Sequence, residues 1–74
     1  MDKYKNLGGN SGITHYEIGN DYIKIQFTSG KIYIYTYNSA GKNNIEIMKK
    51  LALKGQGLNS FIMNNVKDLY EDKY

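Results

Sequence analysis

The stretch TSGKIYIYTYNSAGK, residues 28 to 42, decides the fold because aromatic and aliphatic residues alternate along it. Tyr33 and Tyr35 lie two positions apart, and Ile32 and Ile34 alternate with them. A β-strand points alternate side chains to opposite faces of its sheet. One face therefore carries phenols and the other carries isoleucines, and the turn before the strand determines which face is buried.

That turn contains the tripeptide Thr-Ser-Gly at 28 to 30. A three-residue loop needs a positive φ only at its last residue, which is Gly30. A two-residue loop would instead require a positive φ at Ser29, which suits asparagine or glycine better. The three-residue loop sets Tyr33 opposite Ile25, so the phenols are predicted to share a face with an apolar row.

Two further strands are predicted before this one, ITHYEI at 13 to 18 and YIKIQF at 22 to 27, and the third strand is predicted over 31 to 37. A two-residue loop at Asn20-Asp21 joins the first two strands. These loops place one set of residues on the face that we expect to form the structural core: Tyr16, Ile18, Ile23, Ile25, Phe27, Tyr33 and Tyr35.

A helical period follows the strands. The segment NSAGKNN is predicted to be a loop, with Asn43 or Asn44 as the N-cap of a helix that ends at Gly55. One stripe of this helix is apolar and faces the core: Ile45, Met48, Leu51 and Ala52.

A second helix is predicted over 58 to 70, with Asn59 as its N-cap and Leu58 packed as a staple against Met63. Four of its side chains are expected to face inward: Phe61, Ile62, Val66 and Leu69.

The sequence therefore predicts an α+β fold, a three-stranded antiparallel β-meander followed by two short α-helices packed on one face. Residues 1 to 10 are polar and glycine-containing, and we expect a flexible N-terminal leader there. Residues 11 to 74 are expected to form a single domain, because a chain of 74 residues has enough apolar surface for only one core.

Composition argues against several classes of site. The chain has no cysteine and one histidine, so we expect neither a disulfide framework nor a metal site, and no cofactor. No apolar run reaches the roughly 18 residues of a membrane span, so we expect a cytoplasmic protein with no membrane partner. The formal net charge is +3 and every basic residue is lysine, which attracts phosphate without the forked geometry of arginine.

No catalytic constellation is found. SAGKNN follows a strand and precedes a helix, but Thr36 and Asn43 stand where a phosphate-binding loop needs glycine and serine or threonine. His15 has no paired nucleophile or carboxylate site and is interpreted as a surface strand residue. We therefore expect a protein that is not an enzyme.

The segment KGQGLNS at 54 to 60 has two interpretations. Free amide groups at the start of the second helix, together with the glycines and Lys54, would bind an anion such as phosphate. The simpler interpretation is a C-cap and an N-cap joined by a tight turn.

The tyrosines of the third strand, Tyr33 and Tyr35, also have two interpretations. Their rings either pack in the core or lie exposed as a platform that stacks on bases.

Several blocks resemble the KTSC domain, named for a C-terminal segment of some lysyl-tRNA synthetases. They are Ser11 and Ile13 at the start of a strand, IKIQF with a turn ending in Gly30, the pair Tyr33-x-Tyr35, and KGQGLNSFI at 54 to 62. The resemblance covers roughly residues 11 to 70 and is to the stand-alone form of the domain. It implies a fold in which strands are followed by helices, and an RNA-binding role, which has been suggested for the family.

Two functions remain open. The first is a small module that binds RNA or other single-stranded nucleic acid through lysines and a helix N-terminus. Its candidate residues are Lys24, Lys42, Lys49, Lys50, Lys54, Gly55, Gly57, Asn59 and Ser60.

The second is a structural or protein-interaction module. The outer face of the sheet would expose an apolar strip that the helices cannot cover, made of Tyr22, Ile32 and Ile34. The chain would form a homodimer or dock a partner protein through this strip, or through the free edge of the third strand.

Overall fold

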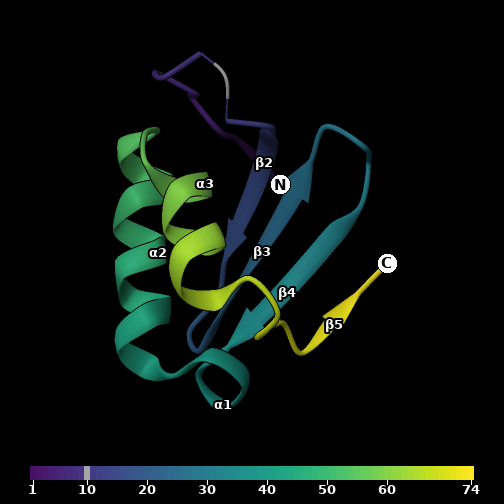
Figure 1. The fold of residues 1–74 in the computed structure, drawn as a ribbon, viewed down its shortest axis with the longest axis vertical. Helices are drawn as coiled ribbons and strands as arrows, with labels where there is room; N and C mark the ends of the chain where they lie inside the picture. The colour runs from purple at the N-terminus through teal and green to yellow at the C-terminus, as the bar shows by residue number, and fades with distance from the viewer. Residues whose placement is uncertain (10) are drawn as a thin grey trace.

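The computed structural model describes residues 1–9 and 11–74. Its five strands form one antiparallel sheet in chain order, β1-β2-β3-β4-β5, and the helices lie on one side of it (Figure 1). The fold is α+β as expected, but the sheet has two more strands than the meander that we predicted. The elements are β1 (Asp2–Lys3), β2 (Ile13–Ile18), β3 (Tyr22–Phe27), β4 (Ile32–Thr36), α1 (Tyr37–Ala40), α2 (Lys42–Lys54), α3 (Leu58–Phe61), the π-helix η1 (Ile62–Val66) and β5 (Asp72–Lys73).

The register of the three central strands is confirmed. Tyr33 lies opposite Ile25 across β3 and β4, and Tyr16 lies opposite Ile25 across β2 and β3. Gly30 adopts a φ of 92°, and the loop is closed by bonds from the Gly30 amide to the Phe27 carbonyl and from the Phe27 amide to the Lys31 carbonyl. The left-handed glycine therefore places the tyrosines on the buried face.

Substitution of Gly30 by alanine tests this turn. A non-glycine residue with positive φ costs about 1–2 kcal/mol, so G30A is expected to lower the free energy of unfolding by that amount. Urea denaturation measures it. Gly8 is the control, because a Cβ there meets no atom within 4 Å and its φ is not left-handed. Equal urea midpoints for G30A and G8A would contradict the assigned turn.

A β-bulge in β2 turns Ile13 into the core. The pairing with β3 shifts between Ile13 and His15, so that Ile13 faces Phe27 while His15 faces Gln26. Without this extra residue, Ile13 would point to the same side as His15, because side chains alternate. Ile13 is only 2% exposed, and the burial of its side chain is what the bulge achieves.

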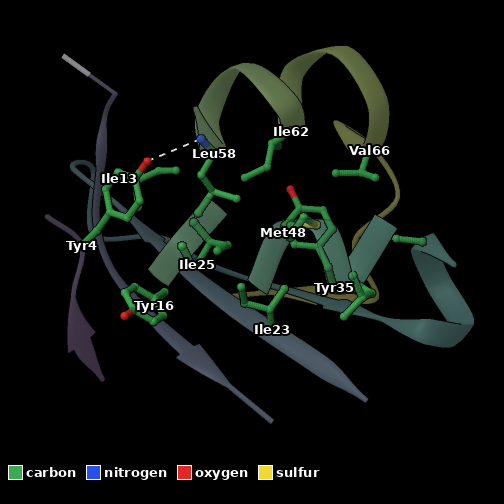
Figure 2. Packing of buried hydrophobic residues seen from close by; sticks show 13 residues of the cluster. Tyr4, Ile13, Tyr16, Ile23, Ile25, Tyr35, Met48, Leu58, Ile62 and Val66 are labelled. Carbon is green, nitrogen blue, oxygen red and sulfur yellow. Dashed lines mark hydrogen bonds between the residues drawn. The ribbon is translucent and has the colours of Figure 1, made fainter. Parts of the chain in front are cut away.

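The core lies between the sheet and the helices. Figure 2 shows the buried side chains of the strands meeting those of α2, α3 and η1. Ile18, Phe27 and Tyr33, predicted to belong to the core face, pack against it but remain half-buried. The buried hydrophobic residues in the described ranges are Tyr4, Ile13, Tyr16, Ile23, Ile25, Tyr35, Ala40, Ile45, Met48, Ala52, Leu58, Ile62 and Val66.

The prediction of a flexible leader over residues 1 to 10 does not fit the structure of its described part, and Asn10 lies outside the described residues. β1 pairs with β2, and Tyr4 is 2% exposed with its hydroxyl 3.4 Å from the Leu58 amide (Figure 2). The Leu7 amide also donates to the Gly55 carbonyl. Sequence reasoning missed this strand because it contains only two residues, both charged.

The second unexpected strand, β5, occupies the edge of β4. Tyr74 exchanges two backbone bonds with Ile32, and the Glu71 amide donates to the Ile34 carbonyl. The edge that we expected to be free for a partner is therefore paired within the chain. The same tripeptide, Asp-Lys-Tyr, supplies β1 and β5, so charged side chains border the sheet on both sides and disfavour further strand addition.

The predicted loop after β4 is partly helical. Thr36 and Ser39 exchange side-chain bonds with each other's backbone amides, which forms a capping box and begins α1 at Tyr37. Neither Asn43 nor Asn44 is the N-cap of α2, because the turn of the chain at Gly41 lets the helix begin at Lys42. α2 ends as predicted at Gly55, whose φ is 82°.

The second predicted helix is shorter and less regular than expected. Gly57, not Asn59, precedes α3, and the helical turns end with η1 at Val66. Leu58 is fully buried whereas Met63 is 46% exposed, so the predicted staple is absent. Beyond Val66 the chain turns toward β4, which leaves Leu69 43% exposed instead of facing inward.

Candidate functional site

The structure separates the lysines that were predicted to bind nucleic acid. Lys24 lies on the outer face of the sheet, whereas α2 packs on the inner face. The Nζ atom of Lys24 is 3.8 Å from Glu17, and that of Lys49 is 2.9 Å from Glu46. The remaining predicted lysines are exposed along α2: Lys42, Lys50 and Lys54. The predicted set is therefore not one site.

Glu46 should affect how the stability of the protein depends on pH in the acid range. Its carboxylate accepts bonds from the Tyr37 hydroxyl and from Lys49, and these lower its pKa from the usual 4.5. Because the pKa of this carboxyl is lower in the folded state than in the unfolded state, the ionised form stabilises the fold at every pH above the unfolded-state pKa. This stabilisation is lost as the pH falls through the folded-state pKa. Replacing Glu46 by glutamine should flatten the decline of the urea midpoint below about pH 4.5. A decline as steep as that of the wild type would show that this carboxylate does not contribute.

The segment KGQGLNS adopts the geometry of two caps. Gly55 and Gly57 both have left-handed φ values and join α2 to α3. The Leu58 amide is directed to the Tyr4 hydroxyl, and the Phe61 amide donates to the Gly57 carbonyl. Asn59 and Ser60 line a further hollow of about 200 Å³ together with Gly8, Ser11 and Gly57. The structure thus supports the turn interpretation over the anion site.

The outer face is less apolar than predicted. Tyr22, Ile32 and Ile34 are each half-buried. The Tyr22 hydroxyl donates to Glu17 at 2.9 Å, and the pKa of Lys24 is raised by Tyr74 and then by Glu17. A polar network therefore crosses the predicted strip. An open hollow of about 630 Å³ lies over this face, bordered by Asp21, Tyr22, Lys24, Ile34, Thr36, Tyr37, Asn38 and Glu71.

A second hollow lies on the inner face, beside β4 and β5, and we call it the aromatic hollow. Its volume is about 280 Å³. Its floor comes from the strands, and its walls come from η1 and the segment that leads to β5. The lining residues are Phe27, Ser29, Tyr33, Tyr35, Met63, Lys67, Asp68, Tyr70 and Lys73.

The rings of the aromatic hollow form one contact network. Tyr33 meets Phe27 edge to face at a centroid distance of 5.2 Å and Tyr70 at 5.1 Å. Tyr33 and Tyr35 are nearly parallel, 6.5 Å apart, because they are neighbours on one face of β4. Phe27, Tyr33 and Tyr70 are half-buried, so parts of these rings face solvent.

Two lysines border the aromatic hollow. Lys73 places its Nζ 5.8 Å from the ring centre of Tyr33 and 5.4 Å from that of Tyr70, which holds it over the rings by cation–π attraction. Lys67 is exposed on the turn after η1. Within residues 1–9 and 11–74, neither lysine has a carboxylate within 4 Å, in contrast to Lys24 and Lys49. The positive charge at this rim is therefore available to a ligand.

Tyr35 lies deepest in the aromatic hollow. It is 1% exposed, and Figure 2 shows its hydroxyl oxygen rising from the sheet toward the side of Ile62 and Val66. Burial, followed by the nearby Tyr33, Tyr70 and Asp68, raises the pKa of this hydroxyl well above its usual value. The hydroxyl therefore stays protonated and keeps its capacity to donate.

Sequence reasoning missed half of the aromatic hollow. It considered the tyrosines of β4, but it placed Lys67, Tyr70 and Lys73 on or beyond a helix whose end it misjudged. The segment YEDKY at 70 to 74 carries no strand signal, because three charged residues in a row separate its tyrosines.

No protein-family model, no curated protein and no solved structure matches this chain. Among the described residues α2, with 13 residues, is the longest helix, and no helix there has the length and hydropathy of a bilayer span.

Proposed function

We propose that this chain is a small module that binds single-stranded nucleic acid, with RNA as the preferred form, through the aromatic hollow. The observation that carries the proposal is that solvent-facing rings lie beside lysines with no carboxylate within 4 Å among the described residues. Phe27, Tyr33 and Tyr70 supply the rings, and Lys67 and Lys73 supply the charge. The sequence blocks that resemble the KTSC domain predict the same kind of ligand, although no family model matches the chain.

The chemistry of the hollow fits this ligand in two respects. Every base has a flat π-face, and stacking on an aromatic side chain contributes about 1–3 kcal/mol per base. Lysines bind phosphates and release counterions, so affinity falls with added salt. The outer hollow, although larger, fits less well, because its lysine is paired with Glu17 and two further acids, Asp21 and Glu71, border it.

Fluorescence anisotropy with a labelled RNA decamer tests the proposal. We expect the logarithm of the association constant to fall linearly with the logarithm of the salt concentration, with a slope of about 0.7 per phosphate contact. Replacing Lys67 and Lys73 together by glutamine should therefore reduce this slope by about 1.4. The matched control replaces Lys42 and Lys50, two exposed lysines of α2.

Both double variants lose the same charge, so the comparison separates a site from general attraction. A smaller effect of the α2 variant is expected. Equal effects would show that the lysines act only through net charge, and absence of binding at low salt would refute the proposal.

The alternative is a protein-interaction module that acts through the outer face. The open hollow of about 630 Å³ around Tyr22 and Ile34 favours it, because such a surface accommodates a partner chain. This alternative predicts a solution mass above that of one chain by light scattering, unchanged by RNA. A Tyr22→Ala variant that returns the mass to one chain would establish the outer face as the contact.

A further inference from the structure

The floor of the aromatic hollow contains a donor that the fold does not use. Among the hydrogen bonds found in residues 1–9 and 11–74, none involves the hydroxyl of Tyr35, although this residue is 1% exposed and lines the hollow. The hydroxyls of Tyr22, Tyr37 and Tyr4 have protein partners, so Tyr35 belongs to the tyrosines whose hydroxyl the fold leaves free. The Tyr35 oxygen is not one of the fully buried side-chain atoms without a partner, which in the described residues are represented by Nδ1 of His15. It therefore opens on the hollow and is free to donate to a ligand.

The volume of the hollow and the angle between its rings suit one small planar ligand. Its volume of about 280 Å³ is just below the usual range of small-molecule pockets, which begins at about 300 Å³. The rings of Tyr33 and Tyr70 meet at 85°, so a flat ligand that stacks on one ring touches the edge of the other. Lys73 lies over both rings, where it would meet the phosphate attached to such a ligand.

We propose that the aromatic hollow holds one unpaired nucleobase, inserted edge first, and that the Tyr35 hydroxyl donates a hydrogen bond to an acceptor on that edge. This inference rests on the proposed function and specifies the ligand. One base leaves the stack of the nucleic-acid strand and enters the hollow, in addition to any bases that stack on the exposed rings. Lys67 and Lys73 bind the flanking phosphates at the rim. Tyr35 is then a recognition residue at the bottom of the site.

The experiment compares two labelled probes, an RNA decamer and an abasic decamer with the same number of phosphates, on wild type and on Tyr35→Phe. The substitution removes one oxygen and keeps the ring in the core. We expect Tyr35→Phe to weaken binding of the RNA about 3- to 10-fold, the effect of one hydrogen bond, and to leave the abasic probe unchanged. Tyr16→Phe is the control, because Tyr16 is buried in the core but does not line the hollow.

The midpoint of thermal unfolding of Tyr35→Phe should stay near that of wild type, since no hydrogen bond among the described residues involves this hydroxyl. If Tyr35→Phe binds RNA as tightly as wild type, or weakens both probes equally, the base-reading role is overturned while nucleic-acid binding stands. If neither probe binds wild type at low salt, the proposed function itself fails.

Discussion

Replacement of Tyr4 by alanine is expected to lower the free energy of unfolding by about 3–5 kcal/mol, the range for truncating a buried aromatic residue. Tyr4 is 2% exposed, and its hydroxyl reaches the Leu58 amide at the start of α3. For a domain of this size, such a loss removes most of the stability. Circular dichroism in urea measures it.

The chain contains its own control for this substitution. Tyr74 ends the same tripeptide, Asp-Lys-Tyr, directly after β5, but its side chain is 58% exposed. Tyr74→Ala should therefore change stability by less than about 0.5 kcal/mol, and Tyr4→Phe should lose only about 0.5–1.5 kcal/mol with its hydrogen bond. Similar midpoints for the two alanine variants would mean that residues 1–9 are the flexible leader that the sequence suggested.

The largest expected effect on binding comes from Tyr70. This residue stands on the segment that leads to β5, and its ring meets those of Tyr33 and Tyr35 at 5.1 and 6.5 Å. If it stacks on a base, Tyr70→Ala should weaken RNA binding roughly 5- to 150-fold, which corresponds to about 1–3 kcal/mol. Anisotropy titrations at one salt concentration measure the change.

Tyr22→Ala provides the matched control, because Tyr22 is also a half-buried tyrosine but belongs to the outer face. Its affinity for RNA should match that of wild type. The opposite ranking, with Tyr22→Ala weak and Tyr70→Ala normal, would move the binding site to the outer hollow.

The central register could be predicted because it depends on local chemistry. Gly30 is the residue that tolerates a φ of 92°, and this one constraint places Tyr35 and Ile23 on the same buried face. Strict alternation in β3 and β4 then determines the remaining pairs. Such features need no knowledge of distant segments.

The edge strands and the second half of the aromatic hollow could not be predicted in this way. β1 and β5 contain two residues each, and both form because a longer strand already presents free backbone groups to them. The tyrosine of this tripeptide is buried at Tyr4 and exposed at Tyr74, so the local sequence alone does not determine whether the ring is buried. Lys73 reaches Tyr33 only after β5 has paired with β4.

The lysines predicted to bind nucleic acid differ from those that border the aromatic hollow for a related reason. Composition drew attention to the lysines of α2, whereas the structure shows which lysines lie beside aromatic rings and which are paired with acids. Lys49 is paired with Glu46, and Lys73 lies over two rings. Pairing of this kind depends on contacts between segments that are distant in the sequence.

A ¹⁵N–¹H NMR titration with the RNA decamer tests the central claim most directly, since it reports on the backbone amides of every element at once. We predict that the largest chemical-shift changes occur at the amides of Phe27, Tyr33, Lys67, Tyr70 and Lys73. The amides at the ends of α2 and on the outer face should change little. Shifts concentrated on the exposed lysines of α2, or around Tyr22 and Ile34, would contradict a nucleic-acid site in the aromatic hollow.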